Sequence, residues 1–265
     1  MFQQPATILW NENVNSAYYR MGLSCEGTLL RAVPGQFIMV RLKAGNDLLL
    51  RRPFSIHGIV TSRGNPRGIE LLYKVVGKGT FRLSEYREGD SLDVIGPLGN
   101  GFTISESYER IHIVSGGIGV APLRFLAMHI ERVTGGKVKP QVFLGGRSDA
   151  DLLCTKEFID LGLPVQITTD DGSSGDQCLI TDPWEVSVSV NPPQMIYACG
   201  PMSMLQCIGG IVSKHGLLCE ASIESAMACG IGACLGCVVR AKDINEQYKH
   251  VCIDGPVFNI QDLKI

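Results

Sequence analysis

The sequence predicts a protein of more than one domain: a β domain, then an α/β domain with a parallel sheet, then a small cysteine-rich domain. Three observations predict this order. The chain has 265 residues, more than one domain usually holds. Short apolar runs bounded by turn residues fill the first hundred residues, whereas strand-like and helical runs alternate from Arg110 onward. The remaining tail is rich in glycine and cysteine and is too short to build a hydrophobic core without a cross-link such as a metal site.

The composition excludes several classes of protein. The net charge is −2 with no basic run, which argues against phosphate-backbone binding as the main role. The hydrophobic fraction of 45% is high enough for packed cores. Ile111 to Ile130, the longest apolar stretch, is interrupted by glycines, Pro122 and Arg124, so we expect no membrane span. The N-terminus lacks the features of a signal peptide, so we expect the ten cysteines not to form a disulfide framework.

In the β domain we expect strands over 36–42, 49–60, 69–76 and 91–95. Short strands at this spacing favour a small barrel or a sandwich. The turn-rich segment from Gly96 to Phe102 makes a natural domain boundary. In the α/β domain we expect strands over 111–115, 141–144, 163–168 and 194–198, with helices over 122–133 and 203–215. The predicted domains are residues 1–102, 103–218 and 219–265.

The tail carries the most specific motif of the chain. Cys229, Cys234 and Cys237 follow the pattern C-x4-C-x2-C, and Cys252 comes after fourteen further residues. This is the plant-type spacing of a [2Fe–2S] cluster. Such an anionic cluster needs backbone N–H groups directed at its sulfurs, and glycines at 230, 232 and 236 let the chain wrap closely. A structural zinc site fits the first gap of four less well, and a redox C-x-x-C pair leaves two of the cysteines unexplained.

Two glycine-containing turns each end a predicted strand and open a predicted helix. The first contains Gly116, Gly117 and Gly119, and the second is Cys199-Gly200-Pro201. Free N–H groups and the helix dipole favour anions at such positions, and both turns can lie at the carboxyl edge of one sheet, where ligands bind. The first turn is not the G-x-G-x-x-G fingerprint, so a simple strand–helix connection is an equal alternative. A third loop, 169–172, contains two aspartates and is either a ribose contact or a solvated turn.

The β domain offers a possible ligand segment of its own, Arg51 to His57. A guanidinium suits phosphate, an aromatic ring stacks on another ring, and a hydroxyl reaches a ring nitrogen. The segment 77–80 comes before a short helical stretch and is a second candidate phosphate seat. Taken singly, paired arginines are commonly a solvated strand end.

These motifs, taken in order, resemble those of the ferredoxin–NADP reductase superfamily. The motifs are Arg52 to Ser55, Gly79-Thr80, Gly116 to Pro122 and Cys199 to Pro201. The cysteine tail, the string Val251 to Phe258 and the segment Gly96 to Phe102 narrow the resemblance to the electron-transfer subunits of NAD-dependent dihydroorotate dehydrogenase B. The resemblance covers residues 5 to 265. It implies a flavin-binding antiparallel β-barrel, an α/β nucleotide domain and a small [2Fe–2S] domain.

The resemblance also implies the residues that bind each cofactor. FAD would be bound by Arg52, Pro53, Phe54, Ser55, Leu72, Tyr73, Lys74, Gly79 and Thr80. Phe54 stands where the superfamily commonly has tyrosine. A phenylalanine there can still stack on the flavin but cannot make the contact of the tyrosine hydroxyl. NAD would be bound by Gly116, Gly117, Gly119, Cys199, Gly200 and Pro201. The cluster would be ligated by Cys229, Cys234, Cys237 and Cys252.

The function implied is electron transfer in pyrimidine biosynthesis, in the cytoplasm. Electrons from dihydroorotate would come from an FMN-containing catalytic subunit, through the cluster and FAD, to NAD+. The chain would work in a heterotetramer of two subunits of each kind, and it offers no recognisable catalytic base. The alternative is the flavin subunit of a hydrogenase, sulfide dehydrogenase, transhydrogenase-like or ferredoxin oxidoreductase complex; Cys229, in place of a carboxylate, weakens the transhydrogenase version. Asp170 and Asp171 favour NAD by repelling a 2′-phosphate, although Arg147 could attract one. A binding module stapled by zinc is the alternative outside redox enzymes.

Overall fold

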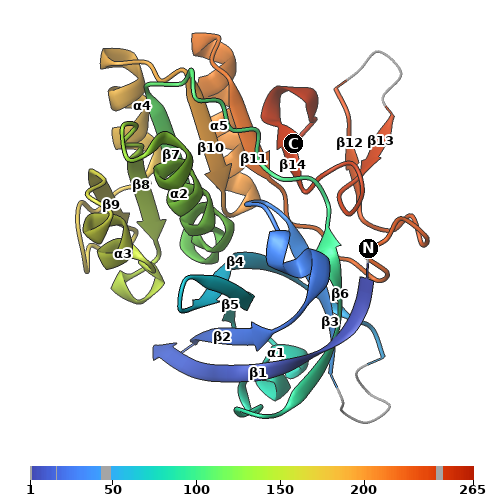
Figure 1. Cartoon of the computed structure of the whole chain (residues 1–265). Coiled ribbons are helices and arrows are strands. Elements are labelled where there is room, and N and C mark those ends of the chain that lie inside the picture. The colour runs from blue at the N-terminus through green and yellow to red at the C-terminus, as the bar shows by residue number, and fades with distance from the viewer. Residues whose placement is uncertain (1, 16, 43–48, 243–246) are drawn as a thin grey trace. The chain divides into compact units, whose positions relative to one another are not determined.

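A computed structural model describes residues 2–15, 17–42, 49–242 and 247–265. The chain forms two compact units (Figure 1). The barrel unit comprises Met1–Gly101, Glu224–Val238 and His250–Pro256, and the sheet unit comprises Phe102–Ile223, Val239–Lys249 and Val257–Ile265. The predicted division into three domains stays a prediction. Segments of the tail belong to both units.

The barrel unit is built on a closed barrel of antiparallel strands in the order β1-β2-β5-β4-β3-β6. The strands are β1 (Phe2–Asn15), β2 (Tyr18–Ser24), β3 (Phe37–Arg41), β4 (Arg52–Ser62), β5 (Asn65–Lys74) and β6 (Ser91–Leu98). Of the barrel and the sandwich that the sequence favoured, the structure has the barrel. Closure leaves these strands no unpaired edge.

The predicted strands of this domain are present with shifted ends. β4 begins at Arg52, later than the predicted residue 49, and β5 begins earlier than predicted, at Asn65. The segment from Gly96 to Phe102 was expected to be turn-rich; its first residues belong to β6, which continues through Leu98 with alternate residues buried. Sequence analysis did not delimit β1 and β2, since long stretches of β1 face solvent and carry no apolar period.

A few further elements complete the barrel unit. A short 3₁₀ helix, Gly27–Arg31, follows β2, and helix α1 (Lys78–Ser84) follows β5. The predicted helical stretch after residues 77–80 therefore begins within that segment, at Lys78. Apolar side chains with no exposed surface fill the barrel, among them Met21, Leu23, Ile38, Val40 and Leu71.

The sheet unit contains a six-stranded sheet in the order β14-β11-β10-β7-β8-β9. Its strands are β7 (Ile111–Gly116), β8 (Gln141–Gly146), β9 (Val165–Thr169), β10 (Met195–Cys199), β11 (Cys219–Ser222) and β14 (Val257–Asn259). All neighbours are parallel except the β11–β14 pair. The predicted parallel sheet is thus confirmed, with one antiparallel strand added from the tail.

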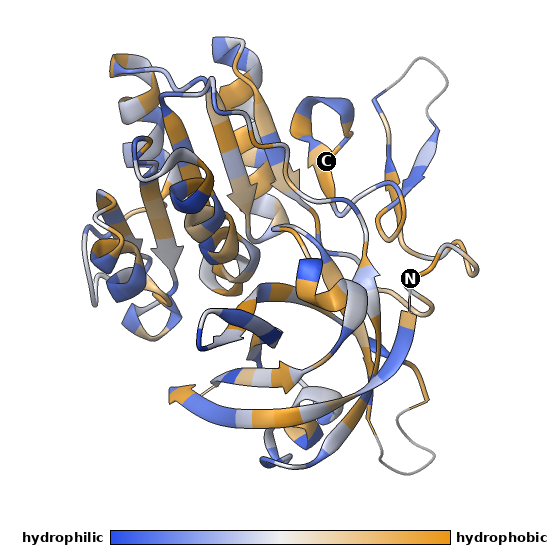
Figure 2. Ribbon diagram, in the orientation of Figure 1, coloured by the Kyte–Doolittle hydropathy of each residue, from blue (hydrophilic) through white to orange (hydrophobic). Residues whose placement is uncertain are grey.

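Helices cover both faces of this sheet. They are α2 (Val120–Thr134), α3 (Thr155–Asp160), α4 (Thr181–Val190) and α5 (Met202–His215), with 3₁₀ turns at Gly117–Gly119, Asp149–Asp151 and Ile260–Asp262. The chain runs outward from β7 to β9 and then returns through β10 to β11, so right-handed crossovers put α2 and α3 on one face and α4 and α5 on the other (Figure 1). In Figure 2 the central strands are mostly apolar, whereas α2 and α5 each have a hydrophilic side.

A buried polar pair lies in the core of the sheet unit. The Trp184 indole N–H donates to Nδ1 of His112 at 3.2 Å, and both side chains are buried. Burial lowers the pKa of His112 to about 4. The histidine is therefore a neutral acceptor at physiological pH.

The tail adds short elements to the fold. β12 (Val238–Arg240) and β13 (Tyr248–His250) form a two-stranded sheet. Farther along, β14 pairs with β11, with Ala221 opposite Phe258. No helix in the described part of the chain has the length and hydropathy that a membrane-spanning segment requires.

Candidate cofactor sites

The predicted flavin segment lies on β4 next to the end of β5. The rings of Phe54 and Tyr73 meet edge to face with centroids 5.8 Å apart, and Tyr19 stacks on Tyr73 at 5.6 Å. The Tyr73 hydroxyl donates to Oδ1 of Asn11 at 3.0 Å, and burial raises its pKa. This tyrosine is 2% exposed. Two of the predicted flavin residues, Phe54 and Tyr73, are thus brought into contact, and the partly exposed Phe54 is the one accessible to a ligand.

The two arginines at the start of this segment have different surroundings. Arg51 forms a 2.7 Å ion pair with Asp93 of β6, so it joins strands of the barrel. Arg52 extends to α1, where a Cβ on Gly79 would lie 2.6 Å from the guanidinium Nε. Arg52 also donates to the carbonyl of Leu50. Because residue 79 has no side chain, the Arg52 guanidinium can lie beside the first turn of α1. A phosphate-binding site formed jointly by Arg52 and the start of α1 requires this arrangement.

The remaining residues of the flavin set have roles in the fold itself. Thr80 Oγ1 accepts hydrogen bonds from the backbone N–H of Val76 at 2.9 Å and of Gly77 at 3.2 Å, so it holds the turn before α1. Lys74 places its ammonium 4.7 Å from the Tyr18 ring centroid. Leu72 is buried, while Pro53 and Ser55 are partly exposed. The roles of all these residues in flavin binding stay predictions.

The two predicted nucleotide turns lie side by side at the carboxyl edge of the sheet. β7 and β10 are parallel neighbours, and Ser115 is opposite Cys199. A Cβ on Gly119 would lie 2.5 Å from the carbonyl carbon of Cys199, and one on Gly200 would lie 3.0 Å from the backbone nitrogen of Gly116. The glycines therefore let two helix starts approach with backbone alone, as anion binding by N–H groups requires.

The other members of this set border the same two turns. Gly117 has a φ of 52°, a left-handed conformation that suits glycine. Pro201 immediately precedes α5, and its Cδ would be 2.7 Å from a Cβ on Gly116. Cys199 is buried. The structure thus gathers the whole predicted NAD set, although contact with the nucleotide stays a prediction.

The acidic loop after β9 lies at the same edge of the sheet but farther along it, because β8 separates β9 from β7. The backbone N–H groups of Asp170 and Asp171 donate to the carbonyls of Gly146 and Arg147 at 3.0 and 3.1 Å. The Asp171 carboxylate accepts from the hydroxyl and N–H of Ser173, which lowers its pKa. Asp171 thus orders its own loop; the ribose contact stays a prediction.

The four tail cysteines lie on two segments of the barrel unit. Cys229, Cys234 and Cys237 lie on Glu224–Val238, the cysteine loop, and Cys252 lies on His250–Pro256, the strap. Backbone N–H groups of Ile231 and Cys234 point at Cys229 Sγ, at 3.5 and 3.4 Å, and the N–H of Gly232 points at Cys252 Sγ at 3.2 Å. Burial raises the pKa of Cys229, but these donors outweigh it and bring the value to about 7. N–H donors aimed at cysteine sulfurs are what an anionic iron–sulfur cluster requires, so the residues fit that group.

The backbone of this loop differs from the expectation at one glycine. Gly230 and Gly232 have left-handed φ angles, as their predicted role requires, but Gly236 does not; its neighbour Leu235 adopts the left-handed conformation instead. A Cβ on Gly230 would lie 2.7 Å from Sδ of Met39 on β3. The first turn of the cysteine loop therefore packs against β3 of the barrel. Burial raises the pKa of Cys252 to about 12, helped by its hydrogen bond with Cys237.

Comparison with known proteins assigns a family to each segment. Residues 10–102 match the oxidoreductase FAD-binding domain, residues 113–209 the oxidoreductase NAD-binding domain, and residues 224–264 the iron-sulfur cluster binding domain of dihydroorotate dehydrogenase B. The dihydroorotate dehydrogenase B (NAD(+)) electron transfer subunit of Caldanaerobacter subterraneus subsp. tengcongensis is 38% identical over 97% of this chain and 96% of its own. That of Desulforamulus reducens is 39% identical over 86% of this chain and 85% of its own.

The chain belongs to this family of electron transfer subunits. It is an oxidoreductase subunit, and its cofactors are FAD, NAD and an iron–sulfur cluster. The predicted fold and the family resemblance are thereby confirmed. The zinc-stapled binding module is not supported, since the tail matches a cluster-binding domain.

Solved structures agree with this fold. The NADH-dependent reduced ferredoxin-NADP oxidoreductase, described in a study of flavin-based electron bifurcation, superposes with a TM-score of 0.83 at 25% identity, covering 98% of this chain and 89% of its own. A ferredoxin NADP+ reductase from Neisseria gonorrhoeae with bound FAD and NADP superposes with a TM-score of 0.67 at 13% identity, covering 85% of this chain and 93% of its own. The second likeness concerns the fold alone.

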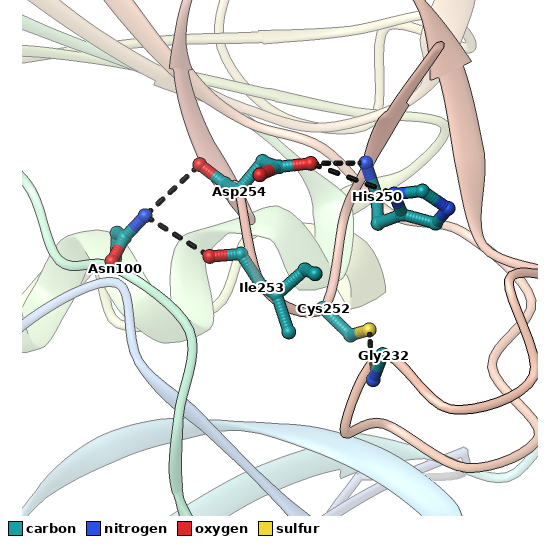
Figure 3. A network of polar contacts seen from close by, with 6 residues as sticks. All are labelled: Asn100, Gly232, His250, Cys252, Ile253 and Asp254. Carbon is teal, nitrogen blue, oxygen red and sulfur yellow. Dashed lines mark hydrogen bonds and ion pairs between the residues drawn. The ribbon is translucent and has the colours of Figure 1, made fainter.

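Sequence analysis missed one polar cluster of this electron transfer subunit, centred on Asn100 and Asp254 (Figure 3). Both residues lie in strings that marked the family, but neither was given a role. The available signal was an asparagine among glycines at the end of a strand, which is an ordinary turn signature. Only the folded chain brings it beside the strap that carries Cys252.

Proposed function

We propose that this subunit takes electrons singly from an FMN-containing catalytic partner onto a [2Fe–2S] cluster and delivers them through FAD to NAD+. When bound, these groups supply one-electron exchange at the cluster, conversion between one- and two-electron transfer at the flavin, and hydride acceptance at the nicotinamide. The supporting observation is the cysteine quartet with backbone N–H groups directed at two of its sulfurs. The matching family model supports the same assignment.

Within the barrel unit, two adjacent strands carry the supports for both redox groups. Gly230 of the cysteine loop packs on Met39 of β3, and Met39 is paired in register with Pro53 of the flavin segment. Because β3 and β4 are hydrogen-bonded neighbours, the cysteine loop and the flavin segment share one rigid support. Electron exchange requires a short and constant separation between the two groups, which such a support favours.

On the nucleotide side, we propose that the two helix starts at the carboxyl edge bind the pyrophosphate of NAD through backbone N–H groups. Gly119 and Gly200 exclude side chains from the contact between the turns. Cys199, buried at the end of β10, acts there as a positioning residue for the nicotinamide. Dihydroorotate chemistry then belongs to the partner, which supplies its acid–base groups.

The proposed partner contact is an exposed apolar rim formed by Ile231 and Leu235 of the cysteine loop and Ile253 of the strap. Leu235 is 61% exposed and has a φ of 55°. An apolar side chain kept in a left-handed conformation and in solvent is costly on its own, which favours a role in binding. Cys234, also exposed, would bring the cluster close to this surface. We propose an assembly of two subunits of each kind, in the cytoplasm, where the ligand thiols stay reduced.

The proposed function is tested by measuring NADH oxidation and dihydroorotate oxidation separately, with and without the catalytic subunit. The isolated chain should oxidise NADH with ferricyanide and should not oxidise dihydroorotate; adding the catalytic subunit should connect the two activities. Turnover of dihydroorotate with NAD+ by the chain alone would refute the proposal. Coupling to reduced ferredoxin but not to the catalytic subunit would instead support the ferredoxin oxidoreductase alternative. The TM-score of 0.83 to the NADH-dependent reduced ferredoxin-NADP oxidoreductase is the observation that favours this alternative.

The partner contact has a separate test with a matched control. Leu235→Asp should weaken association with the catalytic subunit at least tenfold in an equilibrium binding assay while NADH–ferricyanide activity stays. Val190→Asp, at an 81% exposed position on α4 of the sheet unit, is the control and should leave association unchanged. Equal affinity for both variants would show that the rim is not the contact.

A further inference from the structure

The segment that follows β6 is hydrogen-bonded to the strap that carries the fourth cysteine. The Asn100 carboxamide donates to the carbonyl oxygens of two successive residues, Asp254 at 3.0 Å and Ile253 at 3.4 Å (Figure 3). The backbone N–H of Asn100 donates to the carbonyl of Gly255 at 2.6 Å. One residue thus holds three consecutive peptide groups directly after Cys252.

The same strap is fixed from its other side. The backbone N–H of His250 donates to Oδ2 of Asp254 at 2.6 Å, which closes a tight turn around Val251 and Cys252. The N–H of Gly232 donates to Cys252 Sγ, so the cysteine loop meets the strap at the sulfur itself. Cys252 lies between these two attachments in Figure 3. Its position therefore depends on how the strap is held.

Packing next to Asn100 leaves little freedom for the strap. Gly99 has a φ of 72°, and a Cβ there would lie 2.5 Å from Cδ of Pro256 and 3.0 Å from the ring of Phe37 on β3. The Gln36 side chain donates to the carbonyl of Gly99 at 3.0 Å. The Asn100 amide is thus presented by a segment that is itself anchored on the barrel.

We propose that Asn100 is a positioning residue for the iron–sulfur cluster: it orients the strap so that Cys252 completes the ligand set. The carboxamide suits this role because its NH₂ group has two donors, one for each carbonyl. The inference rests on the proposed function, in which Cys252 is a cluster ligand. It adds a residue outside the cysteine motifs, directly after the barrel strand β6, that decides how firmly the cluster is held.

Asn100→Asp is the sharpest test, because the carboxylate has nearly the same shape but only accepts hydrogen bonds. The variant is prepared in the complete complex with its partner subunit. Iron, acid-labile sulfide and FAD are measured per chain, followed by the rate of cluster bleaching by an iron chelator and the electron paramagnetic resonance spectrum after reduction. Asn65→Asp, at an exposed position of the β4–β5 hairpin, is the matched control.

We expect Asn100→Asp to lose its cluster about tenfold faster than the wild type, to shift or broaden the resonance, and to keep its FAD. Asn65→Asp should match the wild type. If Asn100→Asp does not assemble, Asn100→Ser, which introduces no charge, replaces it with the same expectation. A bleaching rate within twofold of the control with an unchanged resonance would overturn the proposal, as would parallel loss of FAD and cluster, the mark of general unfolding.

One further variant separates this proposal from the function on which it rests. Cys252→Ala should remove the cluster while FAD stays bound. If it does and Asn100→Asp has no effect, only the positioning role fails. If Cys252→Ala keeps an intact cluster, the proposed ligand set is wrong and the positioning role is overturned with it.

Discussion

Replacing Gly119 by alanine tests the contact between the two nucleotide turns. Gly119 has a φ of −58°, which any residue adopts, so the added methyl group acts through its size alone. It would lie 2.5 Å from the carbonyl carbon of Cys199 and 2.7 Å from the nitrogen of Gly200, against an ordinary contact of at least 3.4 Å. The turns must therefore separate by roughly 1 Å. Both obstacles are backbone atoms, so no side-chain rotation relieves the overlap.

Overpacking of this kind costs about 1–3 kcal/mol, which corresponds to a loss in NAD affinity of about 5- to 150-fold where binding requires the unseparated turns. The assay is equilibrium binding of NAD together with stopped-flow reduction of the bound flavin by NADH. FAD and cluster contents should stay at wild-type values, because their residues lie in the barrel unit.

Gly210→Ala is the matched control, since Gly210 lies in α5 with nothing within 4 Å of an added Cβ. Alanine in a helix interior is favoured over glycine by about 0.5–1 kcal/mol, so this variant should be slightly more stable and bind NAD normally. Equal NAD affinity and equal unfolding temperatures for the two variants would refute the argument that the turns need direct backbone contact.

Three other changes have defined outcomes. Burial lowers the pKa of His112 to about 4, whereas the same histidine titrates near 6.5 in the unfolded chain. The contribution of neutral His112 to the free energy of unfolding is therefore complete above pH 6.5 and falls toward pH 4 by at most about 1.4 kcal/mol per pH unit. Urea unfolding at pH 7.5 and 5 should show this decline, and an equal free energy of unfolding at both pH values would contradict it. Arg52→Ala should weaken FAD binding by about 1.5–3 kcal/mol, the value of a hydrogen bond to a charged group, and unchanged flavin retention on dilution would locate the anchor elsewhere. Cys234→Ser should lose iron and labile sulfide, each near two per chain in the wild type, but keep FAD; zinc without labile sulfide in the wild type would contradict the cluster.

The sequence alone determined the motifs whose chemistry depends on local spacing. The four cysteines and their glycines predict a cluster because the ligands lie close together along the chain. Four strands and two helices after Arg110 were predictable for a similar reason: the buried strands are continuous apolar runs, and the helices α2 and α5 carry a regular apolar face. The helices α3 and α4 and the strands β11 to β14 were not predicted. Residues carried over from the family resemblance, such as Arg52 and Gly79, were identified by motif and not by geometry.

The tertiary structure decided which distant segments meet, and which residue of a motif carries each role. Arg51 and Arg52 are adjacent in the sequence, yet Arg51, just before β4, pairs with Asp93, whereas Arg52, the first residue of β4, lies against Gly79. Asn100 meets the strap after Cys252 across more than 150 residues of sequence. Local spacing carries no information about such contacts. They follow from strand order and register, which are set by the packing of the whole chain.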